Sequence, residues 1–325
     1  MNASAVADSL RPGDAGTGAV VACCQLAPVL GRPAANRELA ADAVTRAAAS
    51  GASIVVLPEL MSSGYVFESR AEARASAETA EGETVTGWAR LAARHGIVIV
   101  GGFCEAAGAE LFNSAVLVDP DGLRCVYRKA HLWDNESRWF TPGSTAPPVV
   151  ATRFGQIGVM ICYDLEFPEW VRLPALRGAQ LLCAPTNWPA FPRPEGERPA
   201  EVVRVQADAA VNRMFIAACD RTGSERGVDW VGGSVIVDPD GWPLAAARQA
   251  AVPRQAAVPR QAAVPPAAAA AGPATISAVC RLGDALDKSV GPRNDVHADR
   301  RPELYGQVTE PARAQPPSAI SASSS

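Results

Sequence analysis

Short apolar runs that alternate with helical segments are the feature of this sequence that most constrains its fold. Residues 19–26 ("AVVACCQL"), 53–58 ("SIVVLP") and 97–103 ("IVIVGGF") are almost continuously apolar, as is typical of strands buried on both faces. Between them, residues 35–50 are rich in alanine and residues 86–96 have a helical pattern that ends at a glycine. Because such strands need helices on their outer faces, the pattern predicts an α/β protein.

The second half of the chain repeats this order. Residues 167–179 predict a helix with a second, kinking proline at 174, and residues 200–213 predict another helix, with apolar strands before and after it. Residues 230–241 ("WVGGSVIVDPDG") also echo residues 113–122 ("NSAVLVDPDG"), where an Asp-Gly turn predicts a hairpin. Two similar halves whose sheets pack face to face give the expected layering of helices, sheet, sheet and helices.

We expect one folded domain over residues 18–310, with disordered tails at 1–17 and 311–325. An unusual segment, 248–272, interrupts this domain and begins with the hexapeptide "RQAAVP" written three times. A proline at every sixth residue prevents a regular helix or a central strand, and the repeats are too short for a solenoid. The segment is therefore predicted to be an expanded, mobile loop.

Composition excludes several classes of function. The net charge is −4, the basic residues are scattered, and no apolar run reaches the roughly 20 residues of a membrane span. We therefore expect no nucleic-acid partner and no membrane partner. The first residues lack the basic start and apolar stretch of a signal peptide, which favours a cytoplasmic protein.

The eight cysteines offer little material for a metal site. None forms a C-x-x-C pair, there are only three histidines, and no H-E-x-x-H motif occurs. Nucleotide-binding glycine motifs are also absent from the sequence. We expect no metal, no organic cofactor and mostly reduced, structural thiols.

One cysteine is placed differently. Cys162, in "VMICYDLEFPEW", stands between an apolar strand and a predicted helix, where α/β proteins present nucleophiles, although a buried structural thiol would explain it as well. A nucleophilic thiol needs a base. None of the three histidines has a convincing position, but Glu59 follows an apolar strand and could serve if burial raised its pKa.

Attack on a carbonyl or nitrile carbon builds negative charge that needs donors. Lys129, at the end of the strand "LRCVYRK", is a candidate donor, and Glu136 follows seven residues later. Taken separately, Glu59 could be a helix cap and Lys129 an ordinary surface lysine.

Together, these motifs resemble the nitrilase (carbon–nitrogen hydrolase) superfamily. The matching pieces are "GASIVVLPELMSSGY", "YRKAHLW…E…WFTPG", "GVMICYDLEFPEWVRLPALRGAQLL", "PTNW" and the final "NDVHADRRPELYG". The likeness spans roughly residues 19–306, and the proline–alanine insert departs from it, which bears on the pairing of the strands beside the insert. The resemblance implies a four-layer α-β-β-α sandwich and subunits assembled at least as dimers.

The resemblance also implies a role for each site residue. Glu59 matches the general base and acid, Lys129 the oxyanion-stabilising lysine, Cys162 the nucleophile and Glu136 the second glutamate. The N–H of Tyr163 matches the second oxyanion donor. The position of Asn187, in "PTNW", matches a residue that lines the substrate pocket.

Residues after the nucleophile favour one branch of the superfamily. The stretch "CYDLEFPE" is more similar to amidases and carbamoylases than to nitrilases proper. We expect hydrolysis of a small aliphatic amide to carboxylate and ammonia through a Cys162 thioester. A nitrilase, or an N-carbamoyl amidohydrolase, is the alternative, and a non-catalytic scaffold with the same fold is a hypothesis of another class.

Overall fold

The computed structural model describes residues 18–194, 196–247 and 272–311, and within them the strands form two six-stranded sheets. The first sheet has the order β14-β1-β2-β3-β4-β5 and the second the order β13-β12-β9-β8-β7-β6. The strands of the first sheet are β1 (Ala19–Gln25), β2 (Ile54–Val56), β3 (Val98–Ala107), β4 (Glu110–Asp119), β5 (Gly122–Arg128) and β14 (Ala274–Cys280). The strands of the second are β6 (Val149–Thr152), β7 (Gly155–Val159), β8 (Leu181–Thr186), β9 (Phe215–Asp220), β12 (Val235–Val237) and β13 (Pro243–Ala246).

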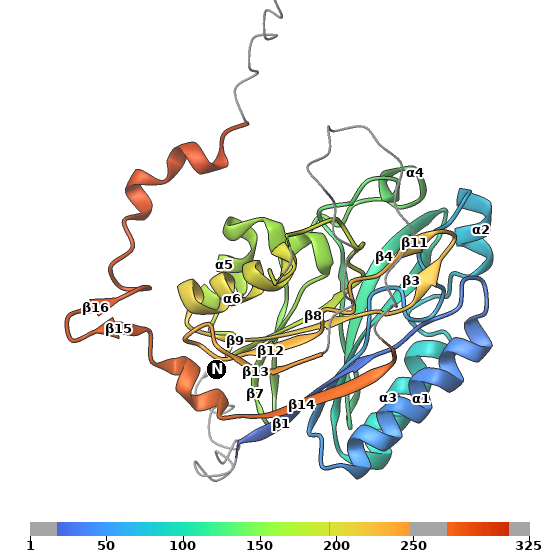
Figure 1. The fold of residues 1–325 in the computed structure, drawn as a ribbon, viewed down its shortest axis with the longest axis horizontal. Coiled ribbons are helices and arrows are strands. Elements are labelled where there is room, and N and C mark those ends of the chain that lie inside the picture. Colours follow the sequence, from blue (N-terminus) through green and yellow to red (C-terminus); the bar gives the residue numbers. More distant parts are fainter. Residues whose placement is uncertain (1–17, 195, 248–271, 312–325) are drawn as a thin grey trace, which may run out of the picture.

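Four longer helices cover the outer faces of the two sheets. Helices α1 (Pro33–Ala49) and α3 (Glu83–His95) lie on the first sheet, and α5 (Pro168–Leu176) and α6 (Ala200–Asn212) lie on the second, as Figure 1 shows. The predicted four-layer α-β-β-α sandwich is confirmed. Shorter elements connect or extend these layers: α2 (Arg70–Ala75), α4 (Glu136–Trp139), β10 (Ser224–Glu225), β11 (Val228–Asp229), β15 (Ser289–Gly291), β16 (Asn294–Asp295) and four 3-10 helices at Cys162–Glu166, Leu282–Leu286, Pro302–Leu304 and Gly306–Thr309.

The alternation of side chains along the strands explains why the sequences of the buried strands are continuously apolar. In β1, Val21 and Cys23 belong to the core between the two sheets, whereas Ala22 and Cys24 pack in the layer of α1 and α3. Successive side chains of a strand point to opposite faces, so a strand covered on both faces must be apolar at every position. Burial is complete or nearly so at all four of these residues.

Several predicted elements are shorter in the structure than in the sequence pattern, among them the strand predicted at 53–58, of which only β2 (Ile54–Val56) forms. The helix predicted at 167–179 ends at Leu176, shortly after Pro174, which cannot donate a helical backbone hydrogen bond. The strand within 230–241 is reduced to β12, because the segment before it forms a turn at Gly232 (φ +62°) and the N–H of Gly233 bonds the side chain of Asp220 instead of a neighbouring strand.

The predicted loop at 248–272 lies almost wholly outside the described residues, but the strands on both sides of it are well formed. Strand β14 pairs antiparallel with β1 along seven residues, from Ala19 opposite Cys280 to Gln25 opposite Ala274. Strand β13 is the edge of the second sheet and β14 the edge of the first. The insert therefore joins one sheet to the other and leaves the pairing of β14 intact. The tails predicted at 1–17 and 312–325 also lie outside the described residues.

Candidate active site

The site lies where four strands of the two sheets reach their carboxyl ends. Glu59 follows β2 and Lys129 follows β5 in the first sheet, whereas Cys162 follows β7 and Asn187 follows β8 in the second. Glu136 begins the short helix α4, seven residues after the lysine. All five side chains are at most 7% exposed. The face-to-face packing of the sheets thus brings together residues that are distant in the sequence.

A buried lysine between two carboxylates forms the centre of the site. Lys129 Nζ lies 2.8 Å from Glu59 Oε1 and 2.8 Å from Glu136 Oε2. The backbone N–H of Trp133 donates to Glu136 Oε2 at 2.8 Å, which fixes the second carboxylate. Glu136 Oε1 also lies 2.9 Å from Nζ, so three carboxylate oxygens surround the ammonium, and two of them belong to one carboxylate that can share a single proton.

Asn113, on β4, is a site residue that sequence reasoning missed. Its Nδ2 donates to Glu59 Oε1 at 2.7 Å and to Glu136 Oε1 at 3.1 Å, so it bridges the two carboxylates. The only signal in the sequence is an amide within an otherwise apolar strand. The other oxygen of Glu59, Oε2, is buried and has no hydrogen-bond partner among the described residues. That oxygen is therefore available to accept a proton.

Cys162 sits on a sharp turn between strand and helix. Its φ of +44° lies in the left-handed region, which a residue with a Cβ adopts only under constraint. It is the first residue of the 3-10 helix Cys162–Glu166, and Tyr163 is the second. The first N–H groups of a helix have no partner within the helix, so this turn presents a thiol and backbone donors together.

Charge and burial shift the pKa values of Glu59, Lys129 and Cys162. Burial raises the pKa of Glu59 to about 7, against the opposing effect of Lys129. Burial and the charge of Glu59 also raise the pKa of the Cys162 thiol well above its ordinary value. Burial disfavours the charged form of Lys129, but Glu136 and Glu59 outweigh it and raise the lysine's pKa. At neutral pH the lysine is therefore charged and the thiol protonated.

Asn187 contacts both Cys162 and Glu59, through its backbone and its side chain. Its carbonyl oxygen lies 3.9 Å from Cys162 Sγ, and its Nδ2 donates to the backbone oxygen of Glu59 at 3.0 Å. The Asn187 Oδ1 atom is buried without a hydrogen-bond partner in the described part of the chain. The structure thus places Asn187 beside the other predicted residues.

Aromatic side chains lie beside this cluster, and of these only Tyr163 was predicted from the sequence, through its backbone N–H. Burial and the nearby Glu136 raise the pKa of the Tyr65 hydroxyl, although the residue as a whole is partly exposed. Trp133 contacts Tyr163 at 4.9 Å between ring centroids, and Tyr163 contacts Phe167 at 5.2 Å. Each of these rings is partly exposed, so they form an apolar rim on which a small substrate could pack.

His131 has a structural partner that the sequence did not indicate. Its backbone N–H and its Nδ1 contact Asp164 Oδ1 at 3.0 and 2.7 Å, and its ring stacks on Phe167 at 3.8 Å. The Tyr127 hydroxyl donates to the other oxygen of Asp164 at 2.7 Å. Because Asp164 follows Cys162 by two residues and His131 follows Lys129 by two, this contact links the loops of the nucleophile and the lysine.

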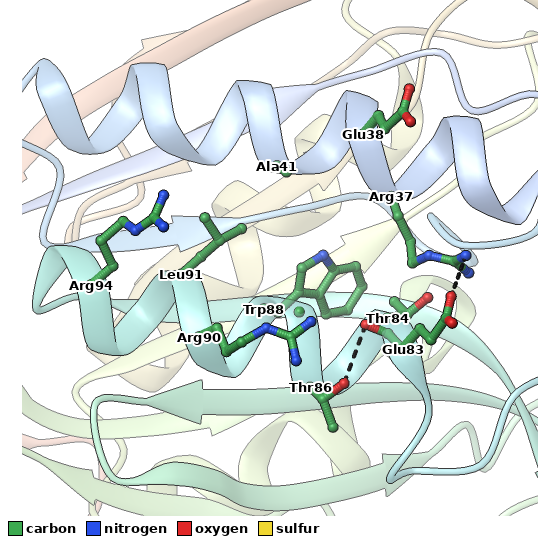
Figure 2. Close-up of a pocket in the computed structure, with 11 residues that line it drawn as sticks. Arg37, Glu38, Ala41, Glu83, Thr84, Thr86, Trp88, Arg90, Leu91 and Arg94 are labelled. Carbon is green, nitrogen blue, oxygen red and sulfur yellow. Dashed lines mark hydrogen bonds and ion pairs between the residues drawn. The ribbon is translucent and has the colours of Figure 1, made fainter.

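A metal site and a surface pocket are the other places where chemistry could be located. No group of three or more potential metal ligands occurs among the residues the structure describes. A surface pocket of about 590 Å³ lies between α1 and α3 and is lined by Arg37, Trp88 and Arg94, among others (Figure 2). None of the buried site residues lines it, so we assign the chemistry to the strand ends.

Comparisons with known proteins agree with the geometry. The family model described as carbon–nitrogen hydrolase matches residues 20–260, and the chain belongs to this family, the nitrilase superfamily of enzymes. The chain is 35% identical over 288 residues to a nitrilase of Pyrococcus abyssi, covering 88% of this chain and 98% of the relative. It is also 34% identical over 200 residues to an (R)-stereoselective amidase of a Pseudomonas species, covering 61% of this chain and 70% of that one.

The fold is also similar to that of a relative whose structure is solved. An amidase from a Nesterenkonia species superposes with a TM-score of 0.69 at 27% identity, covering 89% of this chain and 96% of that protein. A mutant of that amidase carries the acetamide moiety of fluoroacetamide bound covalently at its active-site cysteine. The relatives place the chain among enzymes, against the hypothesis of a non-catalytic scaffold. Among the described helices, none has the length and apolar character needed to cross a membrane.

Proposed function

We propose that this protein is a thiol amidase that hydrolyses a small aliphatic amide to a carboxylate and ammonia through a thioester on Cys162. The observation that carries the proposal is the buried cluster of Glu59, Lys129 and Cys162, in which Glu59 Oε2 is unpartnered among the described residues. A base with an unused oxygen, a cation and a thiol in one enclosed site are the groups that acyl transfer requires.

The first half of the reaction forms the thioester. Glu59 takes the thiol proton as the sulfur of Cys162 bonds to the amide carbon, and the carbonyl oxygen becomes an oxyanion. The third proton of Lys129 and the N–H of Tyr163 hold this oxyanion, and donors of this kind are typically worth about 3–4 kcal/mol each. Glu59 then passes its proton to the amide nitrogen, the C–N bond breaks, and ammonia leaves.

The second half releases the acid. Glu59 removes a proton from water as the water oxygen attacks the thioester carbon, and a second oxyanion occupies the same donors. Its collapse breaks the C–S bond, the proton returns from Glu59 to sulfur, and the carboxylic acid departs and ionises in solution. Glu136 and Asn113 hold Lys129 and Glu59 in position throughout. No step requires a cofactor.

An amide is the preferred substrate for two reasons. The sequence after the nucleophile is similar to that of the amidase branch, and the solved relatives include an amidase complexed with acrylamide. A nitrilase remains the second candidate, because the Pyrococcus abyssi nitrilase matches over 98% of its length. Relatives named N-carbamoylputrescine amidase keep N-carbamoyl compounds as a further substrate class to test.

Parallel ammonia-release assays on an amide and on the nitrile of the same carbon skeleton test the proposal. We expect kcat/KM for the amide to exceed that for the nitrile at least ~10-fold, which corresponds to about 1.4 kcal/mol in barrier. An N-carbamoyl compound of similar size completes the series. Faster turnover of the nitrile would replace the amidase assignment by the nitrilase one.

We also propose that the chain works as a homodimer or larger homo-oligomer. The 3-10 helices Pro302–Leu304 and Gly306–Thr309 contain no buried residue, and Figure 1 shows this segment leading away from the body of the protein. Leu304 and Val308 are 63% and 55% exposed, which suits packing against a second copy. Light scattering on the wild type and on a Leu304→Asp/Val308→Asp variant tests this. The variant should have the molar mass of a smaller assembly than the wild type.

A cytoplasmic location is likewise proposed. It is supported by the eight cysteines, all within the described residues and all free thiols.

A further inference from the structure

A buried ion pair stands behind the site and has no part in the reaction proposed above. Arg221 and Glu225 are 1% and 7% exposed, and Arg221 Nη2 lies 3.1 Å from Glu225 Oε1. The Nε and Nη1 atoms of Arg221 have no hydrogen-bond acceptor among the described residues. Burying such a pair requires desolvation of both charges and is weak evidence for a stabilising role. We therefore looked for what the pair holds in place.

The second oxygen of Glu225 binds the backbone of another loop. Glu225 Oε2 accepts from the N–H of Tyr65 at 2.9 Å and from the N–H of Val66 at 2.6 Å. Gly64 makes this approach possible: it has a φ of +80°, and a Cβ there would lie 2.8 Å from Glu225 Oε1 and 2.6 Å from the Cα of Leu30. The carboxylate thus sits against the backbone that carries Tyr65.

Arg221 supports the same tyrosine from the side of its ring. The guanidinium lies 4.6 Å from the centroid of the Trp230 ring and donates to the backbone oxygen of Pro28 at 2.9 Å. Trp230, itself 1% exposed, meets the Tyr65 ring edge-on with centroids 5.4 Å apart. The backbone and the ring of Tyr65 are therefore both fixed by one buried assembly.

Tyr65 connects this assembly to the reacting groups. Its hydroxyl faces Glu136, and burial together with this carboxylate raises the pKa of that hydroxyl. The Glu136 carboxylate in turn contacts Lys129 Nζ through both oxygens, at 2.9 and 2.8 Å. We propose that Glu225, held by Arg221, is a positioning residue that acts through Tyr65: it sets the tyrosine hydroxyl on Glu136 and so orients Lys129 toward the substrate oxygen. This inference rests on the proposed function and adds to it a second layer of residues that orient the oxyanion donor.

A double-mutant cycle separates positioning from a merely structural role. Glu225→Gln replaces one carboxylate oxygen by an NH₂ group. Because this group only donates, it would face another donor, either the guanidinium of Arg221 or the backbone N–H of Tyr65. Tyr65→Phe removes only the hydroxyl. We expect Glu225→Gln to lower kcat/KM roughly 10- to 100-fold, as small misplacements of catalytic groups do. If Glu225 acts through Tyr65, kcat/KM of the double variant should be at most about threefold lower than kcat/KM of the less active single variant.

The matched control is Glu72→Gln. Glu72 forms an ion pair with Arg226, whose guanidinium also donates to the backbone oxygen of Val66, but it makes no contact with Tyr65. This substitution also replaces an ion-paired glutamate by glutamine in the same region, and it should leave kcat/KM within about twofold of the wild-type value. Rates are normalised to active sites counted by alkylation of Cys162 with iodoacetamide. Losses that multiply in the double variant would overturn the proposal.

Two further measurements keep the outcome decisive. If Glu225→Gln does not fold, Glu225→Asp retains the charge, shortens its reach, and enters the same cycle with Tyr65→Phe. The rate constant of Cys162 alkylation gives a second cycle that does not need turnover, and multiplicative effects there also contradict the inference. An inactive wild type toward amides, nitriles and N-carbamoyl compounds would instead reject the proposed function, whereas the alkylation cycle would still test the role of Glu225.

Discussion

At the scale of single residues, the site contains more buried negative groups than buried positive groups. One ammonium, Lys129, faces two carboxylates, Glu59 and Glu136, in a region from which water is excluded. The cluster therefore carries one excess negative charge when both acids are ionised, and burial raises the pKa of Glu59 to about 7. A group with a pKa near the working pH can both accept and return a proton, as the proposed mechanism requires.

The pH dependence of amide hydrolysis follows from this shift. Because the free enzyme must hold Glu59 unprotonated to receive the thiol proton, kcat/KM should decline as the pH falls through about 7, by tenfold per unit well below it. Rates between pH 5 and 9 test this. Circular dichroism at each pH is the control, since burial also raises the pKa values of Asp208 and Asp220 to about 7. A constant kcat/KM down to pH 5 in folded protein would contradict the role of Glu59.

Replacement of the proposed nucleophile or base tests the mechanism directly. Cys162→Ala removes the sulfur, and Glu59→Gln keeps the shape of the side chain but cannot take a proton. Each should lower turnover roughly 10⁴-fold or more, because groups that act as a unit are lost together. Melting temperature and circular dichroism should show a folded protein in both cases. Activity above a trace in Cys162→Ala would exclude a thioester.

At the scale of elements, the position of Glu59 depends on how closely its loop approaches β3. The N–H of Met61 donates to the oxygen of Gly102 at 2.9 Å, and the N–H of Gly102 donates to the oxygen of Pro58 at 3.1 Å. A Cβ at Gly102 would lie 2.5 Å from the nitrogen of Leu60 and 2.6 Å from the Cα of Glu59. Backbone atoms cannot rotate away as a side chain can, so only glycine allows this contact.

Gly102→Ala should therefore displace the Glu59 loop. We expect a loss of roughly 10- to 100-fold in kcat/KM from misplacement of the base. Overpacking of this kind should also lower the free energy of unfolding by about 1–3 kcal/mol. Gly283→Ala is the matched control, because a Cβ at Gly283 meets nothing within 4 Å. Chemical denaturation and amide kinetics measure both effects, and wild-type activity in Gly102→Ala would show that the loop adapts without moving Glu59.

At the scale of the whole molecule, the two sheets are joined through the segment that contains the repeated hexapeptide. Strand β13 ends at Ala246 and β14 begins at Ala274, so the connection passes from the edge of one sheet to the edge of the other. Residues 248–271 lie outside the described residues, and their mobility stays a prediction. The strands that flank them are paired, β13 with β12 and β14 with β1.

Removal of two of the three "RQAAVP" copies should leave amide kinetics nearly unchanged. The closure entropy of a loop changes by only about 0.6 kcal/mol for each doubling of its length, so the melting temperature should shift little. Hydrogen exchange on the intact chain provides the complementary measurement, with rapid exchange expected at 248–272. Slow exchange throughout that segment, or a large loss of activity on trimming, would show that the insert is an ordered part of the protein.

The sequence by itself determined the order of the elements and the positions of Glu59, Lys129 and Cys162 near strand ends. Continuous apolar runs identify strands covered on both faces, and Glu59 and Cys162 each stand three residues after the end of such a strand, whereas Lys129 directly follows the edge strand β5. A position relative to a strand end is a local property, so a linear pattern contains it. The prediction was less accurate where tertiary contacts replaced local preference, as at β12, whose preceding segment bonds Asp220 rather than extending the strand.

Only the tertiary structure decided which other residues meet the site. Asn113 reaches Glu59 across 54 residues, and Glu225 reaches the backbone of Tyr65 across 160. Neither contact has a periodic or motif signature, because the first depends on the order of β2 and β4 in one sheet and the second on the paths of loops from different sheets. Those paths are set by the packing of the two sheets against each other, which is a property of the folded molecule and of no single segment.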